Sequence, residues 1–258
     1  MADPDDTVPA PDVAPAAAAP ATAAPAAGAA GDEAEARVVA ARMKLKARFE
    51  AAMAASPAAA DPRPQGSGPL NRHGMPKLPV GQVATAKWPV LDLGRKPVVP
   101  LDRWRLILEG EVERRLVLDW AALQALPQVE VAADFHCVTG WSRMDLRWRG
   151  VALRELAARA GLKDTAQFAI CFAHDEYSAN LPLHEALKPD VLVAHTVDGA
   201  PLPVEHGGPA RLITPQLYAW KGAKWIERIK FTARDAQGFW EARGYSNTAH
   251  PWRNDRYS

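Results

Sequence analysis

Cysteine is scarce in this sequence, which has only Cys137 and Cys171 among its 258 residues. Two cysteines are too few for the disulfide framework that stabilises small secreted domains, and they exclude a four-cysteine iron–sulfur or zinc site. A chain of this length can instead bury a sizeable apolar core. Each thiol is then either a small core side chain or a reactive group.

Long apolar runs and an excess of charge are missing as well. Prolines interrupt the alanine-rich tract near the N-terminus, and no stretch approaches the length of an apolar helix that crosses a bilayer. The 31 basic and 30 acidic side chains leave a formal net charge of +1, whereas binding to a nucleic-acid backbone needs a strong basic excess. The phosphate-loop patterns GxGxxG and GxxxxGKS/T are absent too. We therefore expect neither a membrane span nor a nucleic-acid partner.

The N-terminal part of the chain divides by composition into three segments. Residues 1–31 are rich in alanine and proline and have almost no large apolar side chains, so we expect a disordered tail. Residues 32–56 contain good helix formers with apolar residues in partly helical spacing, which predicts a docked or solvated helix without chemistry of its own. Residues 57–79 are rich in proline and glycine, as is typical of a linker or a wrapping segment.

The first residues also bear on location. The segment MADPDDTVPAPDV is acidic where a secretory signal is basic, and the first arginine is Arg37, so we expect neither a secretory nor a twin-arginine leader. This favours a reducing, cytoplasmic setting, in which the thiol of Cys137 is not locked in a disulfide.

Residues 80–258 are predicted to form a single α+β domain of short strands, often neighbours in sequence, with a few short helices. The segments WRLILEG and RLVLDW predict two paired strands, followed by a short helix that Asp119 caps. A second helix is expected over Gly150–Ala160.

The segment QVEVAADFHC alternates between apolar and polar residues, which predicts a strand that ends at Cys137 on its apolar face. Three interpretations of this thiol are open: a small core residue, half of a Cys–His nucleophilic pair, or a metal ligand. The spacing alone favours the core residue. The pair is disfavoured because His136, the neighbour in sequence, should point to the opposite face of the strand. Cys171 lies among apolar residues and is expected in the core.

Two later segments combine small residues with basic ones. HGGPARL has a flexible Gly-Gly pair before Arg211, and KGAKW places Lys221 and Lys224 around Gly222. Small residues let a backbone approach an anion closely, and lysines supply positive charge without fixed geometry. Together the two segments indicate a cradle for an oxyanion or a phosphate.

The motifs HCVTGWS, HGGPARLITP, YAWKGAKWI, GFWEARGY and PWRNDRYS, in this order, resemble those of the sulfite-oxidase-type molybdopterin oxidoreductases. The resemblance is greatest to the small bacterial sulfite oxidase-like proteins and runs from about Leu78 to the C-terminus. It implies the sulfite-oxidase molybdopterin-binding fold and a molybdenum–molybdopterin cofactor. It also implies that Cys137 is the protein ligand of the metal, a role that suits a soft thiolate.

The same resemblance implies the residues that hold the cofactor. In the methionine-sulfoxide reductase branch, the segment that matches HGGPAR contributes its first and last residues, here His206 and Arg211. The first of these is usually asparagine in that branch. The segment that matches KGAK holds the pterin phosphate, which implies Gly222, Ala223 and Lys224.

The segment TAKWPV corresponds to one that contacts the pterin, which points to Thr85, Trp88 and Pro89. The implied activity is oxygen-atom transfer, either reduction of a sulfoxide or other S- or N-oxide or sulfite-type oxidation. Arg143 is the expected contact to an anionic or dipolar substrate, and Tyr218 is a candidate for proton delivery. The CVxxWS pattern departs from true sulfite oxidases, in which an arginine-rich stretch follows the cysteine.

Because no haem-binding domain is evident and an iron–sulfur cluster is excluded, electrons are expected to come from or go to a separate carrier. Two other hypotheses stay open at this point, a Cys–His hydrolase or transferase and a non-catalytic binding module on the same fold.

Overall fold

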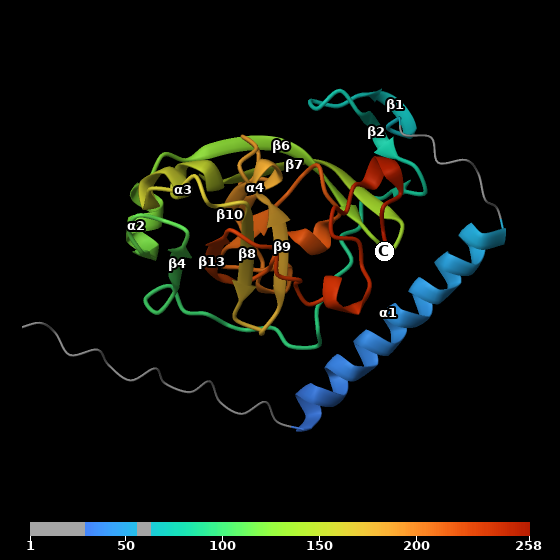
Figure 1. Ribbon diagram of the computed structural model, residues 1–258, viewed down its shortest axis with the longest axis horizontal. Helices are drawn as coiled ribbons and strands as arrows, with labels where there is room; N and C mark the ends of the chain where they lie inside the picture. The colour runs from blue at the N-terminus through green and yellow to red at the C-terminus, as the bar shows by residue number, and fades with distance from the viewer. Residues whose placement is uncertain (1–28, 56–62) are drawn as a thin grey trace, which may run out of the picture.

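The computed structural model describes residues 29–55 and 63–258, and nearly all of the expected tail lies outside these ranges. Four helices are present in the described chain (Figure 1): α1 (Ala29–Ala55), α2 (Trp120–Ala125), α3 (Leu153–Ala160) and α4 (Leu183–Ala186). The strands are β1 (Gly66–Leu70), β2 (Pro76–Pro79), β3 (Val83–Ala84), β4 (Arg105–Gly110), β5 (Leu116–Asp119), β6 (Val129–Cys137), β7 (Trp141–Ala152), β8 (Phe168–Ala173), β9 (Ser178–Pro182), β10 (Leu192–Val197), β11 (Ala200–Pro201), β12 (Arg211–Ile213) and β13 (Ile226–Thr232). Short 3-10 helices are η1 (Val204–His206), η2 (Ala219–Lys221), η3 (Glu241–Arg243) and η4 (Pro251–Arg253).

Two sheets form the body of the domain. In one, the strand order is β11-β10-β7-β3, with β12 added to β10 and β6 added to β7. In the other, the order is β5-β4-β13-β8-β9. Pairing is antiparallel except between β3 and β7 and between β4 and β13. Strands joined mostly by short connections, with few helices, are the mixed α+β architecture that the sequence predicted.

Strands β6 and β7 bring the cysteine into the interior. They pair antiparallel along most of their length, with a register shift between Ala133 and Phe135. Cys137 ends β6 opposite Trp141, and the turn between them contains Gly140 with a left-handed φ of 95°. Glycine adopts that conformation without steric cost. The turn therefore ends the hairpin directly after the thiol, which joins the main apolar core.

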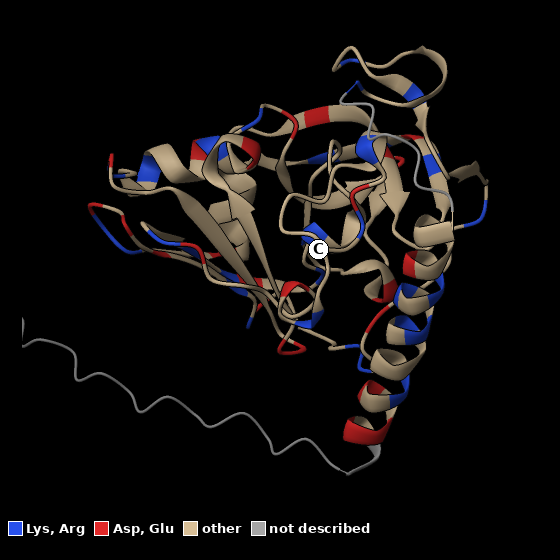
Figure 2. Ribbon diagram, turned by 45° about the vertical axis from the view of Figure 1, so that its right-hand side comes forward, with Lys and Arg blue, Asp and Glu red and all other residues tan. Residues whose placement is uncertain are grey.

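Helix α1 packs along the domain, as Figures 1 and 2 show. Val38, Val39 and Met43 are half-buried against the main core. Acidic side chains stand at its start and basic ones along its middle (Figure 2), and Asp32 forms an ion pair with Arg95 of the domain, with an N–O distance of 2.8 Å. The expected helix is thus a docked one.

The segment 57–79, expected as a linker or a wrapping segment, contains a hairpin in its described part. Strands β1 and β2 pair antiparallel, and Trp252 Nε1 donates to the Pro76 carbonyl at 2.5 Å. Residues 56–62 lie outside the described ranges. This hydrogen bond holds the hairpin against the C-terminal arm, the segment 238–258.

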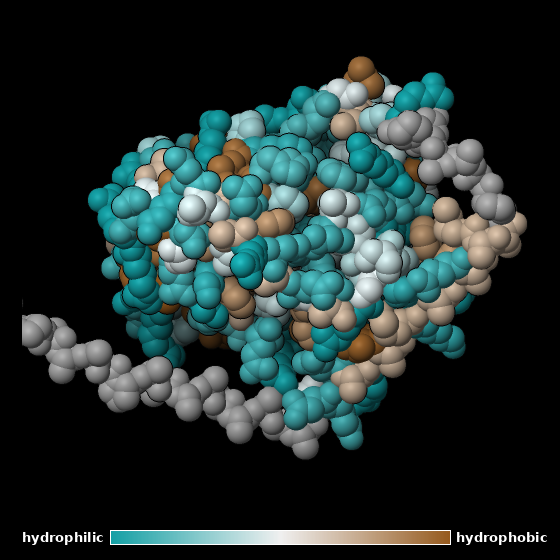
Figure 3. All heavy atoms as spheres, in the orientation of Figure 1, coloured by the Kyte–Doolittle hydropathy of each residue, from teal (hydrophilic) through white to brown (hydrophobic). Residues whose placement is uncertain are grey.

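The visible face of the domain is mostly hydrophilic, while the alanine-rich α1 forms a paler to hydrophobic strip along its edge (Figure 3). Among residues 29–55 and 63–258, no helix has both the length and the apolar character that crossing a membrane requires.

Candidate active site

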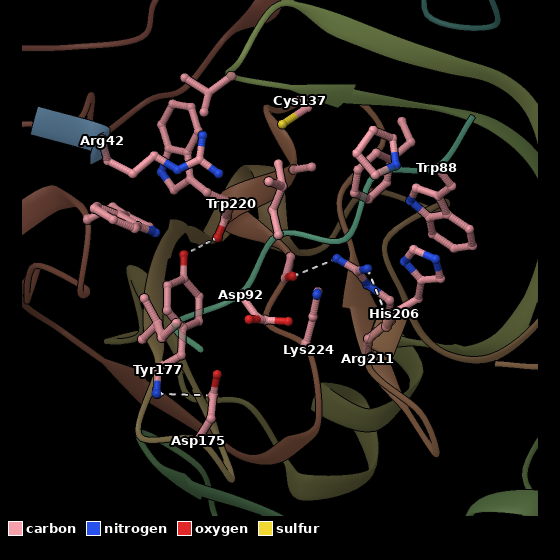
Figure 4. A pocket seen from close by; sticks show the side chains of 18 of the residues that line it. Arg42, Trp88, Asp92, Cys137, Asp175, Tyr177, His206, Arg211, Trp220 and Lys224 are labelled. Carbon is pink, nitrogen blue, oxygen red and sulfur yellow. Dashed lines mark hydrogen bonds between the residues drawn. The ribbon is translucent and has the colours of Figure 1, made fainter. Parts of the chain in front are cut away.

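One cavity lies where the two sheets, the C-terminal arm and α1 meet (Figure 4). The space that no protein atom fills is about 810 Å³, part of it open to solvent. Its wall is rich in aromatic side chains: Trp88, Phe135, Trp141, Tyr177, Trp220, Trp225, Trp240 and Tyr245. Its charged side chains are Arg42, Asp92, Asp175, Arg211 and Lys224.

Cys137 reaches this cavity from the end of β6. Its Sγ lies 3.1 Å from Thr139 Oγ1, and burial raises the pKa of the thiol. The thiol is therefore protonated at neutral pH unless a metal displaces the proton, which metals do on coordination. His136 points elsewhere: its Nδ1 lies 2.8 Å from Ser142 Oγ, and burial lowers its pKa to about 4. The two neighbours do not form a nucleophilic pair, as expected from their opposite faces of the strand.

Arg211, the first residue of β12, is buried and ties two loops together. Its Nη1 donates to the His206 carbonyl at 2.9 Å and its Nη2 to the Gly222 carbonyl at 3.0 Å. Burial lowers the pKa of Arg211 to about 10, so the guanidinium remains charged at neutral pH. It presents that charge to the cavity while it fixes the two loops that flank it.

The two lysines of KGAK have different surroundings. Lys224 lines the cavity, and its Nζ donates to the Glu205 carbonyl at 2.7 Å. Burial, together with the charge of Arg211, lowers the pKa of Lys224 to about 8. Lys221 is fully buried away from the cavity and forms an ion pair with Glu241 at 2.7 Å. Thus Lys224 is placed to hold an anion and Lys221 is placed to support the loop.

Gly222 lines the cavity and Ala223 does not. Ala223 is buried, and its carbonyl accepts a hydrogen bond from the Leu212 amide at 2.9 Å. A Cβ at Gly222 would lie 2.6 Å from the Leu212 carbonyl oxygen, closer than real contacts allow. The close approach of the two loops therefore requires glycine at this position.

His206 and Trp88 form a stacked pair at the edge of the cavity. Their ring centroids are 3.7 Å apart and the planes differ by 6°. Burial and the charges of Lys224 and Arg211 lower the pKa of His206 to about 4, so the imidazole is neutral. Pro89, next to Trp88, also lines the cavity. The pair offers a flat wall of the kind that accepts a planar ring.

Besides Ala223, three residues that the sequence suggested do not lie on the cavity wall. Arg143 forms an ion pair with Asp198 at 3.3 Å and packs behind Trp88, with its guanidinium 5.0 Å from the ring centroid. Tyr218 is fully buried and lies beneath the guanidinium of Arg256, at 5.2 Å. Thr85 uses its hydroxyl to accept from the Lys87 amide at 3.0 Å. The catalytic roles of Arg143 and Tyr218 and the pterin contact of Thr85 stay predictions.

Sequence reasoning missed several residues that line the cavity. Asp175 lies in the turn between β8 and β9, and burial raises its pKa to about 6. Trp240 and Tyr245 come from the C-terminal arm, and Arg42 comes from α1. Of these residues, only Trp240 and Tyr245 had a signal in the sequence, because they lie in the motif GFWEARGY of the C-terminal arm.

These residues fit a cofactor that brings its own metal ligands and a phosphate. In the part of the chain that the structure describes, no three His, Cys, Asp or Glu side chains are grouped to hold a metal ion. A metal at Cys137 would therefore need further donors from a cofactor. Arg211 and Lys224 add positive charge on the same cavity, and the backbone at Gly222 can approach an anion closely.

Comparison with known proteins decides between the remaining hypotheses. The model of the oxidoreductase molybdopterin binding domain matches residues 94–240. This chain belongs to that family. It is a molybdenum-dependent oxidoreductase with a molybdenum–molybdopterin cofactor, which confirms the family, fold and cofactor predicted from the motifs. The hydrolase and the non-catalytic binding module are thereby set aside.

Curated relatives place the chain within the family. An uncharacterized oxidoreductase of Bacillus subtilis, YuiH, is 39% identical over 183 residues, which cover 70% of this chain and 92% of the relative. The protein-methionine-sulfoxide reductase catalytic subunit MsrP of Burkholderia mallei is 34% identical over 53% of this chain and 46% of the relative. The sulfite oxidase of Gallus gallus is 27% identical over 58% of this chain and 39% of its own length. The chain thus matches less than half of each of the last two relatives.

A solved structure shows the same fold. The sulfane dehydrogenase SoxCD from Paracoccus pantotrophus matches with a TM-score of 0.50 and 23% sequence identity, over 54% of this chain and 40% of that one.

Proposed function

We propose that this oxidoreductase transfers an oxygen atom at a molybdenum ligated by Cys137, and that it reduces small organic S- or N-oxides. The observation that carries the proposal is the single cavity that joins the Cys137 thiol to Arg211 and Lys224 behind a wall of aromatic side chains. A sulfoxide reductase among the relatives supports this reaction class.

Different residues of the cavity would hold the metal, the pterin and the phosphate of the cofactor. Cys137 would bind the metal, Trp88 and His206 would contact the pterin, and Gly222 and Lys224 would hold its phosphate. When bound, the molybdenum supplies two-electron oxygen-atom transfer. Reduction of a sulfoxide consumes two electrons and two protons and yields a thioether and water.

The protein's own contribution is to bind, orient and shield. The aromatic wall excludes water from the side of the thiol and suits the apolar body of an organic substrate. Inorganic sulfite has no such body, and Arg143, which follows the cysteine turn, is engaged with Asp198. These features favour organic oxides over sulfite.

The test is metal and pterin content in protein made in a molybdenum-replete host that synthesises the cofactor. The wild type should contain both, and Cys137→Ser should lose molybdenum. Cys171→Ser, at a fully buried site outside the cavity, is the matched control and should retain both. Wild-type protein without either component would overturn the proposal.

Substrate direction is then tested with the loaded protein. Reduced viologen dye should be oxidised in the presence of methionine sulfoxide, dimethyl sulfoxide or trimethylamine N-oxide. Faster reduction of an acceptor dye by sulfite than turnover of any of these oxides would contradict the proposed direction.

We also propose that electrons arrive from a separate carrier and that the protein works in the cytoplasm. Both cysteines are free thiols, which agrees with a reducing compartment. Cell fractionation with an antibody against the protein tests the location, and co-purification under mild cross-linking tests the carrier.

A further inference from the structure

Helix α1 carries a charged side chain into the cavity, although the helix lies outside the segment that matches the family. That segment is 94–240, whereas α1 spans Ala29–Ala55. Arg42, in the middle of α1, is one of the residues that line the cavity together with Cys137. In Figure 4 its side chain extends from α1 towards the part of the cavity where Cys137 stands.

The helix is held so that this side chain has a defined place. Val38 and Met43, four residues before and one residue after Arg42, pack against the main core. Farther along, the Phe49 and Tyr257 rings are 5.3 Å apart in an edge-to-face contact. A Cβ at Gly94 would lie 2.6 Å from Ala34 Cβ, which shows how closely α1 approaches the domain. Arg42 therefore projects from a docked helix and not from a solvated one.

Among the residues that the structure describes, the guanidinium of Arg42 has no counter-charge of its own. Within residues 29–55 and 63–258, no carboxylate lies within 4.0 Å of it and it forms no hydrogen bond. Its side chain is nevertheless half-buried. A partly desolvated arginine without a partner is well suited to bind an anion, because its planar fork of donors matches a carboxylate or another oxyanion.

Arg42 is also separate from the basic residues assigned to the cofactor. It reaches the cavity from α1, whereas Arg211 reaches it from β12 and Lys224 from the loop between η2 and β13. Figure 4 shows the same division, with Arg42 and Cys137 in the upper part and Lys224 and Arg211 below. A phosphate held at Lys224 would leave Arg42 unneutralised.

We infer that Arg42 is a substrate-specificity residue that binds an anionic group, so that the enzyme prefers small S- or N-oxides that carry a carboxylate or a similar oxyanion. This inference rests on the proposed function. The aromatic rings of Trp240 and Tyr245 line the same cavity and would take the apolar part of such a molecule.

The test compares the cofactor-loaded wild type with Arg42→Gln, Arg42→Lys and Arg48→Gln. Arg48 is an exposed residue of the same helix, so its variant removes the same charge away from the cavity. Inorganic sulfate is the binding probe, and its binding is measured by the change in fluorescence of the tryptophans in the cavity wall. We expect Arg42→Gln to weaken sulfate binding by about tenfold to a hundredfold, the usual effect of losing a charged hydrogen-bonding partner. Arg42→Lys should recover part of the affinity and Arg48→Gln should leave it unchanged.

A substrate pair gives a second measurement. N-acetylmethionine sulfoxide is anionic and its amide is neutral, while the two are otherwise nearly the same size. The wild type should have a kcat/KM for the anion about tenfold or more above that for the amide, and Arg42→Gln should abolish this preference without lowering kcat/KM for the amide.

The outcomes separate the inference from the proposed function. Loaded protein in which Arg42→Gln binds sulfate as tightly as the wild type would overturn the inference and leave the proposed function intact. Wild-type protein without molybdenum and pterin would overturn the proposed function itself. If Arg48→Gln weakened sulfate binding as much as Arg42→Gln does, this would also contradict a specific site. The effect would then come from the total positive charge of α1 and not from a contact with Arg42.

Discussion

The ammonium nitrogen of Lys221 lies 2.7 Å from Glu241 Oε1, and both side chains are shielded from solvent. Trp220 Nε1 donates to the same carboxylate oxygen at 2.9 Å, and Lys221 donates to Asn180 Oδ1 at 2.8 Å. This buried network stands behind the loop that presents Gly222 and Lys224 to the cavity. The loop is therefore anchored by a carboxylate that follows the family-matched segment by one residue.

Removal of the Glu241 charge should destabilise the protein. In Glu241→Gln the ammonium of Lys221 would stay buried without a counter-charge, and we expect the free energy of unfolding to fall by about 3–5 kcal/mol. The exposed pair of Glu155 and Arg159 has the same N–O distance of 2.7 Å and is the matched control. Glu155→Gln should cost about 0.5 kcal/mol or less, because solvent screens that pair. Urea denaturation measures both, and equal losses would contradict the importance of burial.

Lys224 should make anion binding depend on pH. Its pKa in the folded protein is about 8, so it loses its charge as the pH rises from 7 to 9. Metal-free protein should therefore bind sulfate, whose own charge is constant over this range, more weakly at pH 9 than at pH 7. Lys224→Met should bind weakly at both values, and a wild type without any pH dependence would contradict the assignment.

The same shift has a consequence for stability. Because the pKa of Lys224 is lower in the folded protein than in the unfolded chain, the unfolded chain binds more protons between pH 8 and 10. The contribution of this lysine to the free energy of unfolding therefore rises with pH across that interval. Comparison with Lys224→Met isolates this contribution from those of other groups.

Gly207→Ala should displace the two cationic residues of the cradle. Gly207 has a φ of 105°, and a Cβ there would lie 2.9 Å from Lys224 Cβ and 3.1 Å from Arg211 Cβ. Gly199, with a φ of 79° and open space around it, is the control for backbone strain alone. We expect Gly199→Ala to lower the free energy of unfolding by about 1 kcal/mol and to retain the cofactor. Gly207→Ala should lower the free energy of unfolding further and lose the pterin, which is measured by the fluorescence of the oxidised pterin.

The imidazole of His206 should stay neutral through the physiological pH range. Its pKa is about 4, so its NMR resonances should shift near that pH and not near 6.5, the value for an exposed histidine. Trp88→Ala should raise the pKa of His206, because removal of the stacked ring admits water. A titration midpoint near 6.5 in the wild type would contradict the burial of this ring.

Local structure could be predicted from the sequence where it depends on neighbours along the chain. Strands β4 and β5 pair as expected, and Asp119 caps α2 by accepting from the Ala122 amide at 2.8 Å. Cys137 ends a strand as its alternating pattern indicated. The motif order also identified the family, because several short segments in series are far more specific than one.

Side-chain direction and distant contacts could not be predicted in this way. The lysines of KGAK diverge because Glu241 and Asn180, remote in sequence, bind one of them. Arg143 and Tyr218 carry suitable chemistry, but Asp198 engages the first and the interior encloses the second. The twelve-residue strand β7 was not anticipated over most of its length, since its polar residues conceal the pairing with β6.

The docking of α1 has a consequence for where the working unit of this protein begins. Similarity to relatives marks out 94–240, yet part of the cavity wall comes from position 42 and part from position 245. A fragment limited to residues 94–240 would lack the parts of the cavity wall that Arg42 and Tyr245 form, even if its sheets assembled. Homologues that share this segment but differ in the flanking segments can therefore catalyse the same reaction at the metal with different substrates.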